Sequence, residues 1–158
     1  MATIKLTTNI NAPVETCFNL SRSIDLHINS MQHTGERAIA GKTSGLIGLN
    51  ETVTWQAKHL GLNMRMTIKI TELMYATSFT DEQVKGPFKK LKHRHIFQYI
   101  DETHTQMTDE FEFVSPMGFI GRAVDDGILR PYLTKLLVKR NETIKQAAEK
   151  QAELKCQH

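Results

Sequence analysis

Hydrophobic and polar residues alternate along much of the chain between residues 3 and 114. The clearest run is 62–71, in which Leu, Met, Met, Ile and Ile alternate with Asn, Arg, Thr, Lys and Thr. Successive strand side chains point to opposite faces, so this run predicts a strand with one buried face and one solvated face. The pattern predicts seven strands in all, at residues 3–10, 36–40, 51–59, 62–71, 75–81, 91–100 and 104–114.

Helical spacing of apolar residues predicts two short helices and one long helix. The short helices, at residues 13–20 and 24–31, begin at a proline and after a serine, and both lie between the first two strands. From Phe119 to Ile144, apolar residues recur every three or four positions, which is typical of a long amphipathic helix. Pro131 lies inside this stripe and must either kink the helix or begin a new segment.

This order of elements predicts an α+β fold. Short connections make successive strands antiparallel neighbours, and a seven-stranded sheet with one dry face needs a cover. Only one long amphipathic helix is available, so we expect a curved seven-stranded antiparallel sheet wrapped around the long C-terminal helix. A single domain is expected over residues 1–150, and the polar tail 151–158 is expected to fray.

Composition and charge exclude several classes of protein. The chain has 158 residues and a net charge of +3, without a basic stripe interleaved with aromatics, so no nucleic-acid partner is expected. Cys17 and Cys156 lie far apart and form no CxxC pair, which favours free thiols in a reducing cytoplasm. We find no signal peptide and no apolar run near ~20 residues, so we expect a cytoplasmic protein without stable membrane insertion, either a monomer or a homodimer.

The segments 91–100 and 104–114 predict a hairpin whose inner face carries ionisable groups as well as apolar ones. With residues 101–103 as a three-residue loop, His95 lies directly opposite Asp109. Opposed residues have Cβ atoms ~4.5–5.5 Å apart, so the two side chains could form a hydrogen bond. The same register pairs Ile100 with His104, Phe97 with Met107 and His93 with Phe111.

A pair formed by His95 and Asp109 has three interpretations. It can be a satisfied buried pair that fixes the strand register, or a polar anchor for the head group of an apolar ligand. It can also supply a general acid and base, because a carboxylate partner orients an imidazole. His95 and Asp109 are therefore the candidate catalytic residues.

His93 and His95 also form an HxH pair on one strand face, roughly 6.6–6.8 Å apart along the chain. Such a pair can hold a metal ion if a third ligand comes from a neighbouring strand, and Asp109 and His59 are the candidates. No glutamate or cysteine completes the set, which favours structural histidines. We therefore expect no metal and no other cofactor.

The element order and two sequence motifs resemble a known superfamily. The motifs are DEQVKGPFKKLKHRHIF, residues 81–97, and TQMTDEFEFVSPMG, residues 105–118. Together with the late helix they are similar to the START-related SRPBCC superfamily, and within it to a bacterial branch described as ligand-binding or polyketide cyclase/dehydrase-like. Two positions depart from that pattern: Pro131 in the closing helix, and Glu102 where such hairpins usually carry glycine.

The resemblance implies a helix-grip fold with a hydrophobic ligand cavity, but it implies no particular reaction. We expect the protein to bind a hydrophobic or amphipathic small molecule, lipid- or polyketide-like, between the sheet and the C-terminal helix. The closing helix, residues 119–145, is expected to gate entry. The ligand-binding candidates are Trp55, Met64, Met66, Phe79, His93, His95, Phe97, Met107, Asp109 and Phe111.

Two other functions stay open on the sequence. One is a cyclase- or dehydratase-type enzyme that uses His95 and Asp109 within the cavity. The other is a protein-interaction module with a filled core, acting through its outer sheet or helix. Asp81 shares a face with Phe79, but it lies at the end of a predicted strand, so a turn-capping or surface role is expected for it.

Overall fold

The computed structural model describes residues 1–116 and 118–158. Seven strands form one sheet: β1 (Ala2–Ile10), β2 (Arg37–Gly41), β3 (Thr52–His59), β4 (Leu62–Met74), β5 (Ser78–Lys85), β6 (Lys90–Asp101) and β7 (His104–Val114). Two short helices and a 3-10 turn follow β1: α1 (Val14–Ser21), α2 (Ile24–Ser30) and η1 (Gln32–Thr34). The C-terminal helical region comprises α3 (Gly118–Val124), a π-helical segment η2 (Asp125–Leu129) and α4 (Arg130–Cys156).

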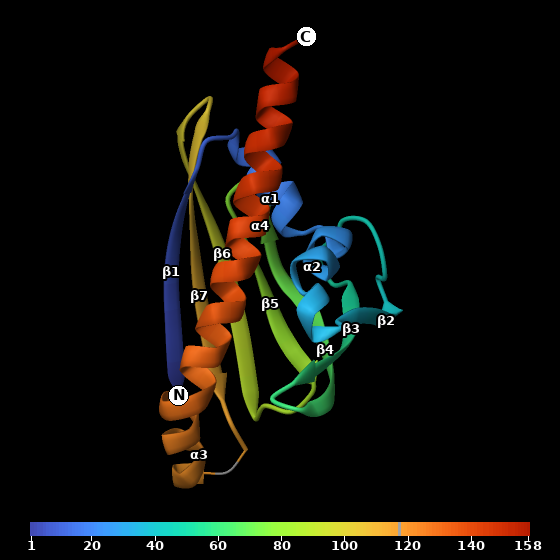
Figure 1. The fold of residues 1–158 in the computed structure, drawn as a ribbon, viewed down its shortest axis with the longest axis vertical. Helices are drawn as coiled ribbons and strands as arrows, with labels where there is room; N and C mark the ends of the chain where they lie inside the picture. The colour runs from blue at the N-terminus through green and yellow to red at the C-terminus, as the bar shows by residue number, and fades with distance from the viewer. Residues whose placement is uncertain (117) are drawn as a thin grey trace.

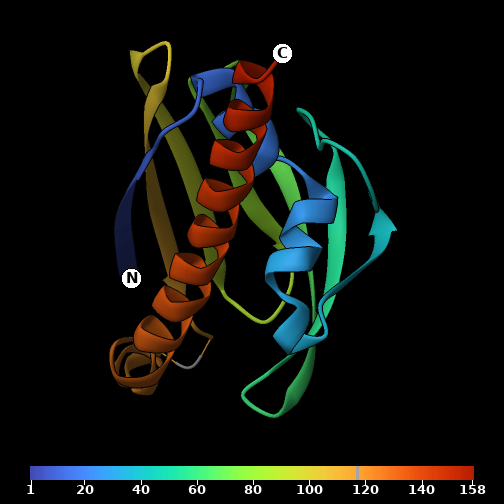
Figure 2. The same cartoon turned by 45° about the horizontal axis from the view of Figure 1, so that its top comes forward.

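The sheet is antiparallel throughout, with the strand order β1-β7-β6-β5-β4-β3-β2. It curves around α4, which crosses its inner face, and α1 and α2 lie beside α4 on the same face (Figure 1). The turned view in Figure 2 shows the same layering, with α4 in front of the sheet. The predicted fold is therefore confirmed: a curved seven-stranded antiparallel sheet around a long C-terminal helix, with two short helices between strands one and two.

Strand β5 differs most from its predicted boundaries. It covers Ser78–Lys85, whereas the alternation pattern predicted a strand at residues 75–81. It continues because it pairs on both sides, so that Asp81 lies opposite Ile70 of β4 and opposite His93 of β6. Asp81 is a mid-strand residue on the inner face, and the turn-capping or surface role predicted for it is wrong.

Two helix starts follow the predicted chemistry. The Ser23 hydroxyl accepts a hydrogen bond from the Leu26 amide (3.1 Å), satisfying one of the amides that a helix N-terminus leaves unpaired. Pro131 stands in the first turn of α4, where its missing N–H costs least, so it begins a new segment rather than interrupting one. The helix then continues to Cys156, through most of the tail that was expected to fray. Within the described residues, no helix combines the length and apolarity that crossing a bilayer requires.

Phe18 of α1 is the centre of the core that packs under the two short helices. Its ring is fully buried and meets Phe79 and Phe97 edge-on, with centroid distances of 5.8 and 5.4 Å. Burying one such side chain stabilises the fold by about 1.5–3 kcal/mol. Ile144 of α4 closes this cluster, while Leu137, nearly two helical turns earlier, packs into a second cluster with residues of β1, β6 and β7. Helix α4 thus rests on the sheet at two places, and residues of both clusters line the cavity described next.

Candidate ligand cavity

A cavity of about 350 Å³ lies between the inner face of the sheet, α2 and the N-terminal half of α4. Most of its lining is apolar, and Leu133 and Leu137 of α4 form the wall opposite the sheet. Seven of the ten predicted ligand-binding residues line it: Trp55, Met64, Met66, Phe79, His93, His95 and Phe111. The two methionines are flexible and polarisable, so this wall can adapt to apolar surfaces of different shape.

Phe97, Met107 and Asp109 do not line the cavity, so for these three the predicted placement is wrong. Helix α1 covers this part of β6 and β7 and makes it solid core. Phe97 packs against Phe18, and Met107 is fully buried with its sulfur 3.5 Å from the Ser21 hydroxyl. Asp109 is also fully buried, behind the two histidine rings. Its influence on the cavity is therefore exerted through the histidines.

The predicted strand register is confirmed where it matters for the site. His95 pairs with Asp109, as expected. The neighbouring pairs are also as predicted: Phe97 with Met107, and His93 with Phe111. The turn differs, since Asp101 rather than Ile100 pairs with His104.

The hairpin turn therefore contains two residues, Glu102 and Thr103. The Asp101 carboxylate accepts hydrogen bonds from the Thr103 amide (2.8 Å) and hydroxyl (3.0 Å), which stabilises the tight turn. Glu102 does not adopt a positive φ, so glycine is not required there. An irregularity between Tyr99 and Asp101 takes up the difference in length, and the inner-face pairing beyond it is unaffected.

The hydrogen bonds do not follow the strand pairing. His95 faces Asp109 across the strands, but its Nε2 lies 2.8 Å from Oδ2 of Asp81. His93 makes the bond to Asp109, with Nε2 2.9 Å from Oδ1. The same Oδ1 lies 3.0 Å from Nδ1 of His95, at an angle that makes no hydrogen bond, and this nitrogen has no other partner among the described residues. Asp109 thus stands behind both imidazole rings.

Helix α4 supplies the remaining partners of Asp109. The Asn141 amide donates to its Oδ2 at 2.6 Å, and Nη1 of Arg140 lies 3.7 Å from its Oδ1. Arg140 also donates to the Asn141 side chain (3.2 Å) and to the backbone carbonyl of Ser21 (3.1 Å). We call the six residues of this network the inner cluster: Asp81, His93, His95, Asp109, Arg140 and Asn141.

Burial sets the protonation of the inner cluster. Desolvation, together with the neighbouring His95 ring, lowers the pKa of His93 to about 4, even though Asp109 favours the charged form. Burial raises the pKa of Asp109, but the hydrogen bond from His93 and the close approach of the His95 ring outweigh it and hold that pKa well below its ordinary value. For Asp81 burial acts in the same direction, and the hydrogen bond from His95 again makes the net pKa low. At neutral pH the inner cluster therefore contains a neutral His93 and two carboxylates, of which Asp81 lines the cavity and Asp109 lies behind the rings.

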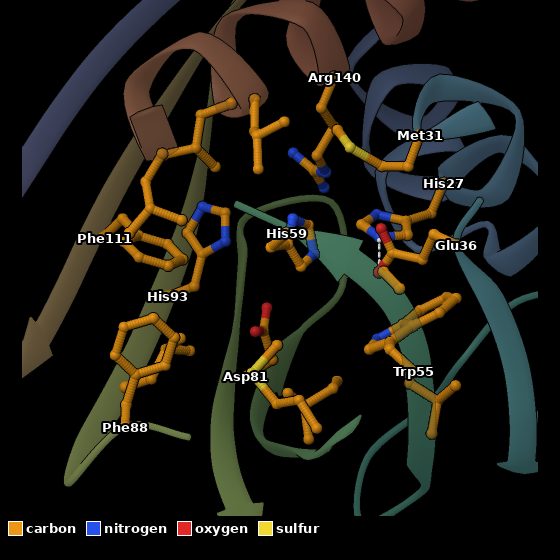
Figure 3. Close-up of a pocket in the computed structure, with 18 of the residues that line it drawn as sticks. His27, Met31, Glu36, Trp55, His59, Asp81, Phe88, His93, Phe111 and Arg140 are labelled. Carbon is orange, nitrogen blue, oxygen red and sulfur yellow. Dashed lines mark hydrogen bonds and ion pairs between the residues drawn. The ribbon is translucent and has the colours of Figure 1, made fainter. Parts of the chain in front are cut away.

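Two simpler polar pairs lie on the opposite side of the cavity, and we call them the outer pairs. Nε2 of His27 lies 3.2 Å from Oε1 of Glu36, and the same ring packs on Trp55 with centroids 4.4 Å apart. Nδ1 of His59 lies 2.8 Å from the hydroxyl of Tyr132, which joins the end of β3 to the first turns of α4. In Figure 3 the first of these pairs and the indole face the His93 side across the open space.

Sequence reasoning missed most of the polar groups in this cavity. The period-two pattern places Asp81 on the same face as Phe79. Its role in the cavity was missed because the strand was predicted to end at residue 81, whereas β5 continues to Lys85. Arg140 falls within the helical stripe from Phe119 to Ile144, whose pattern gives no sign of its polar role. The groups for which no local signal exists are Asn141, Glu36 and Tyr132, because their partners lie far away in the sequence.

The residues expected to complete a metal site with the two histidines are engaged elsewhere. Asp109 lies behind the rings, and His59 pairs with Tyr132. Asp81 is the third potential ligand instead. Each of Asp81, His93 and His95 offers one donor atom, and the three atoms lie within 4.8 Å of one another. The site therefore contains a set of two imidazoles and one carboxylate that the sequence did not suggest.

Neither a known family profile nor a curated protein matches the sequence of this chain. Solved structures do match along nearly its whole length. Protein TTHA0849 from Thermus thermophilus is 16% identical, with a TM-score of 0.66 over 97% of this chain and 98% of that one. A START superfamily protein from Mycobacterium smegmatis is 14% identical, with a TM-score of 0.60 over 96% of this chain and 97% of that one. The chain therefore shares the helix-grip fold of these structures, one of which is a START superfamily protein.

A third helix-grip structure among the matches has an enzymatic name. The Zhui aromatase/cyclase from Streptomyces sp. R1128 is 15% identical, with a TM-score of 0.65 over 96% of this chain and 93% of that one. At these identities the likeness concerns the fold. The helix-grip fold predicted from the sequence is thereby confirmed.

Proposed function

We propose that this helix-grip protein binds a hydrophobic or amphipathic small molecule, lipid- or polyketide-like, in the cavity under α4. The observation that carries the proposal is a largely apolar cavity of about 350 Å³ with a buried polar cluster on one wall. Ligand pockets typically have this combination of apolar lining, a few convergent polar groups and perturbed pKa values. The volume also lies within the ~300–1,000 Å³ usual for small-molecule sites.

The inner cluster provides the polar end of the proposed site. His93 is neutral and its Nε2–H donates to Asp109, so its other ring nitrogen, Nδ1, can accept a hydrogen bond from a ligand hydroxyl. Arg140, which also lines the cavity, can donate to a carbonyl or carboxylate oxygen. The apolar body of the ligand would pack on Trp55, Met66 and their neighbours.

The single tryptophan gives a direct test of this function. Fatty acids, aromatic polyketides and isoprenoids are titrated into the protein while Trp55 fluorescence and thermal unfolding are followed. A compound that binds the cavity should change the fluorescence saturably and, at ~100 times its Kd, stabilise the protein by about 2.7 kcal/mol. That corresponds to a rise in Tm of roughly 5–10 °C for a domain of this size.

A matched pair of substitutions on β3 locates the site. Ala57 lines the cavity and Lys58 is exposed on the other face of the same strand. Ala57→Leu should fill part of the cavity and weaken binding at least tenfold, whereas Lys58→Ala should leave it unchanged. The proposal fails if none of the three classes of compound gives a saturable response, or if Ala57→Leu binds as tightly as the parent.

A cyclase- or dehydratase-type activity is a second candidate, favoured by the histidine–carboxylate contacts of His95. Its ring lies between Asp81 and Asp109, so a bound ketone could meet an oriented imidazole. His93 is the weaker candidate for a base, since a pKa of about 4 is far from neutral pH. This candidate requires His95→Ala to abolish product formation while ligand binding persists. The third candidate, an interaction module acting through its outer sheet or helix, assumes a filled core, and the cavity of about 350 Å³ favours ligand binding over it.

We also make proposals about the location, domain organisation, oligomeric state and partners of the protein. Cys17 and Cys156 are both free, which fits the proposed location in a reducing cytoplasm. We propose further that the chain is one domain over residues 1–150, acts as a monomer or homodimer, and has no nucleic-acid partner. Light scattering and a filter-binding assay test the last two.

A further inference from the structure

We propose that Asp81, His93 and His95 bind a divalent transition-metal ion on the cavity wall. One donor atom from each residue lies within 4.8 Å of the other two. All three side chains line the cavity, and in Figure 3 the His93 ring and the Asp81 carboxylate face the same open space. This site is additional to the proposed binding of an apolar molecule and does not depend on it.

The sheet fixes the three side chains close together. His93 and His95 point to one face of β6, and their ring centroids are 3.7 Å apart. Asp81 lies opposite His93 on β5, and its Oδ2 is 2.8 Å from Nε2 of His95. Donors on one zinc-like ion lie roughly 3–3.5 Å apart when the metal–ligand distances are ~2.0–2.2 Å. Small side-chain rotations therefore bring the three donors into one coordination sphere without moving the strands.

Asp109 is in position to act as the second shell of such a site: it is bonded to His93 and lies next to Nδ1 of His95. Histidines that bind metals usually donate their other ring N–H to a carboxylate, which fixes the tautomer and the ring orientation. Nε2 of His93 lies 2.9 Å from Oδ1 of Asp109, which leaves Nδ1 for a metal. Nδ1 of His95 lies 3.0 Å from that same oxygen and lacks a hydrogen-bond partner among the described residues, which leaves Nε2 for the metal. Asn141 holds the other oxygen of Asp109 at 2.6 Å.

The charges of the cluster suit a cation. Asp81 and Asp109 each contribute −1 when ionised and Arg140 contributes +1, which leaves −1 when both imidazoles are neutral. Metal binding requires neutral imidazole and ionised carboxylate. Among the described residues, Arg140 is the arginine that contacts this cluster, and its guanidinium is directed to Asn141, to the Ser21 carbonyl and to Asp109.

The donor set selects the class of metal. Imidazole ligands favour zinc, cobalt, nickel, copper and iron, whereas magnesium and calcium prefer sites built wholly from oxygen. Three protein ligands leave at least one coordination position open, as in zinc sites that bind water or substrate. The open position faces the cavity, where an oxygen of a bound molecule could occupy it.

Cobalt titration tests the proposal without any organic ligand. Chelator-stripped protein is titrated with Co²⁺ while its visible absorption is recorded, then with Zn²⁺ as competitor. We expect one saturable cobalt site with visible bands, displaced by stoichiometric Zn²⁺ and insensitive to a thousandfold excess of Mg²⁺. Absence of a saturable cobalt spectrum would overturn the metal site and leave the apolar-ligand proposal intact, since fluorescence titration decides that one.

Substitutions separate this site from adventitious binding to the seven histidines of the chain. Asp81→Asn and His95→Gln should each weaken Co²⁺ binding at least 100-fold, and Asp109→Asn, a change behind the rings, should weaken it about 10–100-fold. His104→Gln is the control, because His104 forms an exposed pair with Asp101 (2.8 Å) far from the cavity. Circular dichroism establishes that each variant is folded. If the cobalt bands survive Asp81→Asn and His95→Gln, or are lost with His104→Gln, the ion lies elsewhere and the proposal is wrong.

Discussion

The inner cluster and the outer pairs both put histidines on the cavity wall, yet they are built in different ways. In the inner cluster, Asp109 alone has His93, His95, Asn141 and Arg140 within 3.7 Å. These residues come from two central strands and from α4. Each outer pair is held by one hydrogen bond between two side chains. His27 meets Glu36 in the segment before β2, and the last residue of β3 meets Tyr132.

The number of partners decides what each region can do. A buried charge with several partners cannot lose one without leaving the others unpaired, so the inner cluster holds its geometry firmly. An outer pair can open by breaking one hydrogen bond, which contributes only about 0.5–1.5 kcal/mol net. We infer that the inner cluster fixes the orientation of what binds and that the outer pairs control exchange with solvent.

The largest effect is expected from Asp109→Ala. The substitution leaves His93 as a buried donor without its partner and Arg140 as a buried charge without its ion-pair partner, so the free energy of unfolding should fall by about 3–5 kcal/mol. Urea denaturation monitored by circular dichroism measures this. Glu36→Gln in an outer pair should cost only about 1 kcal/mol, and Lys5→Ala, which breaks an exposed ion pair with Glu110, less still. If Glu36→Gln lowers the free energy of unfolding as much as Asp109→Ala does, the number of partners does not decide the stability of these two regions.

Acidification should destabilise the metal-free protein through the inner cluster. The pKa of His93 falls from 6.5 to about 4 on folding, so between these values the unfolded chain binds more protons than the folded one. The free energy of unfolding is therefore unaffected by the titration of His93 above pH 6.5. As the pH falls from 6.5 to about 4, it decreases by up to about 1.4 kcal/mol per pH unit. The lowered pKa values of Asp81 and Asp109 add a loss of the same sign below about pH 4. Urea midpoints from pH 7 to 4, measured with a chelator present, follow this.

His93→Gln is the control for the pH dependence. A glutamine amide can still donate to Asp109 but does not titrate in this range. The variant should be less stable at pH 7 and should lose less stability between pH 6.5 and 4. An unchanged slope would assign the acid sensitivity to groups outside the cavity.

Among the substitutions at the cavity, the smallest effect on stability is expected from Tyr132→Phe. It removes the hydrogen bond to His59 and keeps the ring, so unfolding should change by no more than about 1 kcal/mol. Release of a cavity ligand should nevertheless become several-fold faster, because the first turns of α4 lose a tie to β3. Stopped-flow Trp55 fluorescence during ligand displacement measures the rate, and Tyr99→Phe, near the exposed end of β6, is the matched control. Equal release rates in the two variants would show that this pair is no gate.

The sheet and its register were predictable because a strand that is buried on one face alternates apolar and polar residues along the sequence. The pairing of His95 with Asp109 followed from that alternation and a short loop, and an irregularity at the turn did not disturb it. Asp81 could not be placed, because a run of polar residues reads as a strand end even where neighbours on both sides extend the strand.

The partners of the histidines were beyond local inference for a geometric reason. Two residues directly opposite on a sheet share a register, but which ring nitrogen meets which carboxylate depends on side-chain rotation and on the third strand. Asn141 reaches Asp109 from a helix 32 positions away. The rotation of that helix about its own axis is set by packing over its whole length, so no single stretch of sequence encodes it.

The π-helical segment before α4 has a consequence for how that helix meets the cavity. The Arg130 amide bonds to the Asp125 carbonyl, five residues back, so η2 contains one residue more than the same span of α-helix. In an unbroken α-helix each added residue turns everything beyond it by about 100°. Here the extra residue is accommodated in the single wide turn of η2. Regular α-helical hydrogen bonding resumes in α4, with Pro131 in its first turn. The one extra residue is thus accommodated before the flank of α4, from Leu133 to Arg140, that faces the cavity.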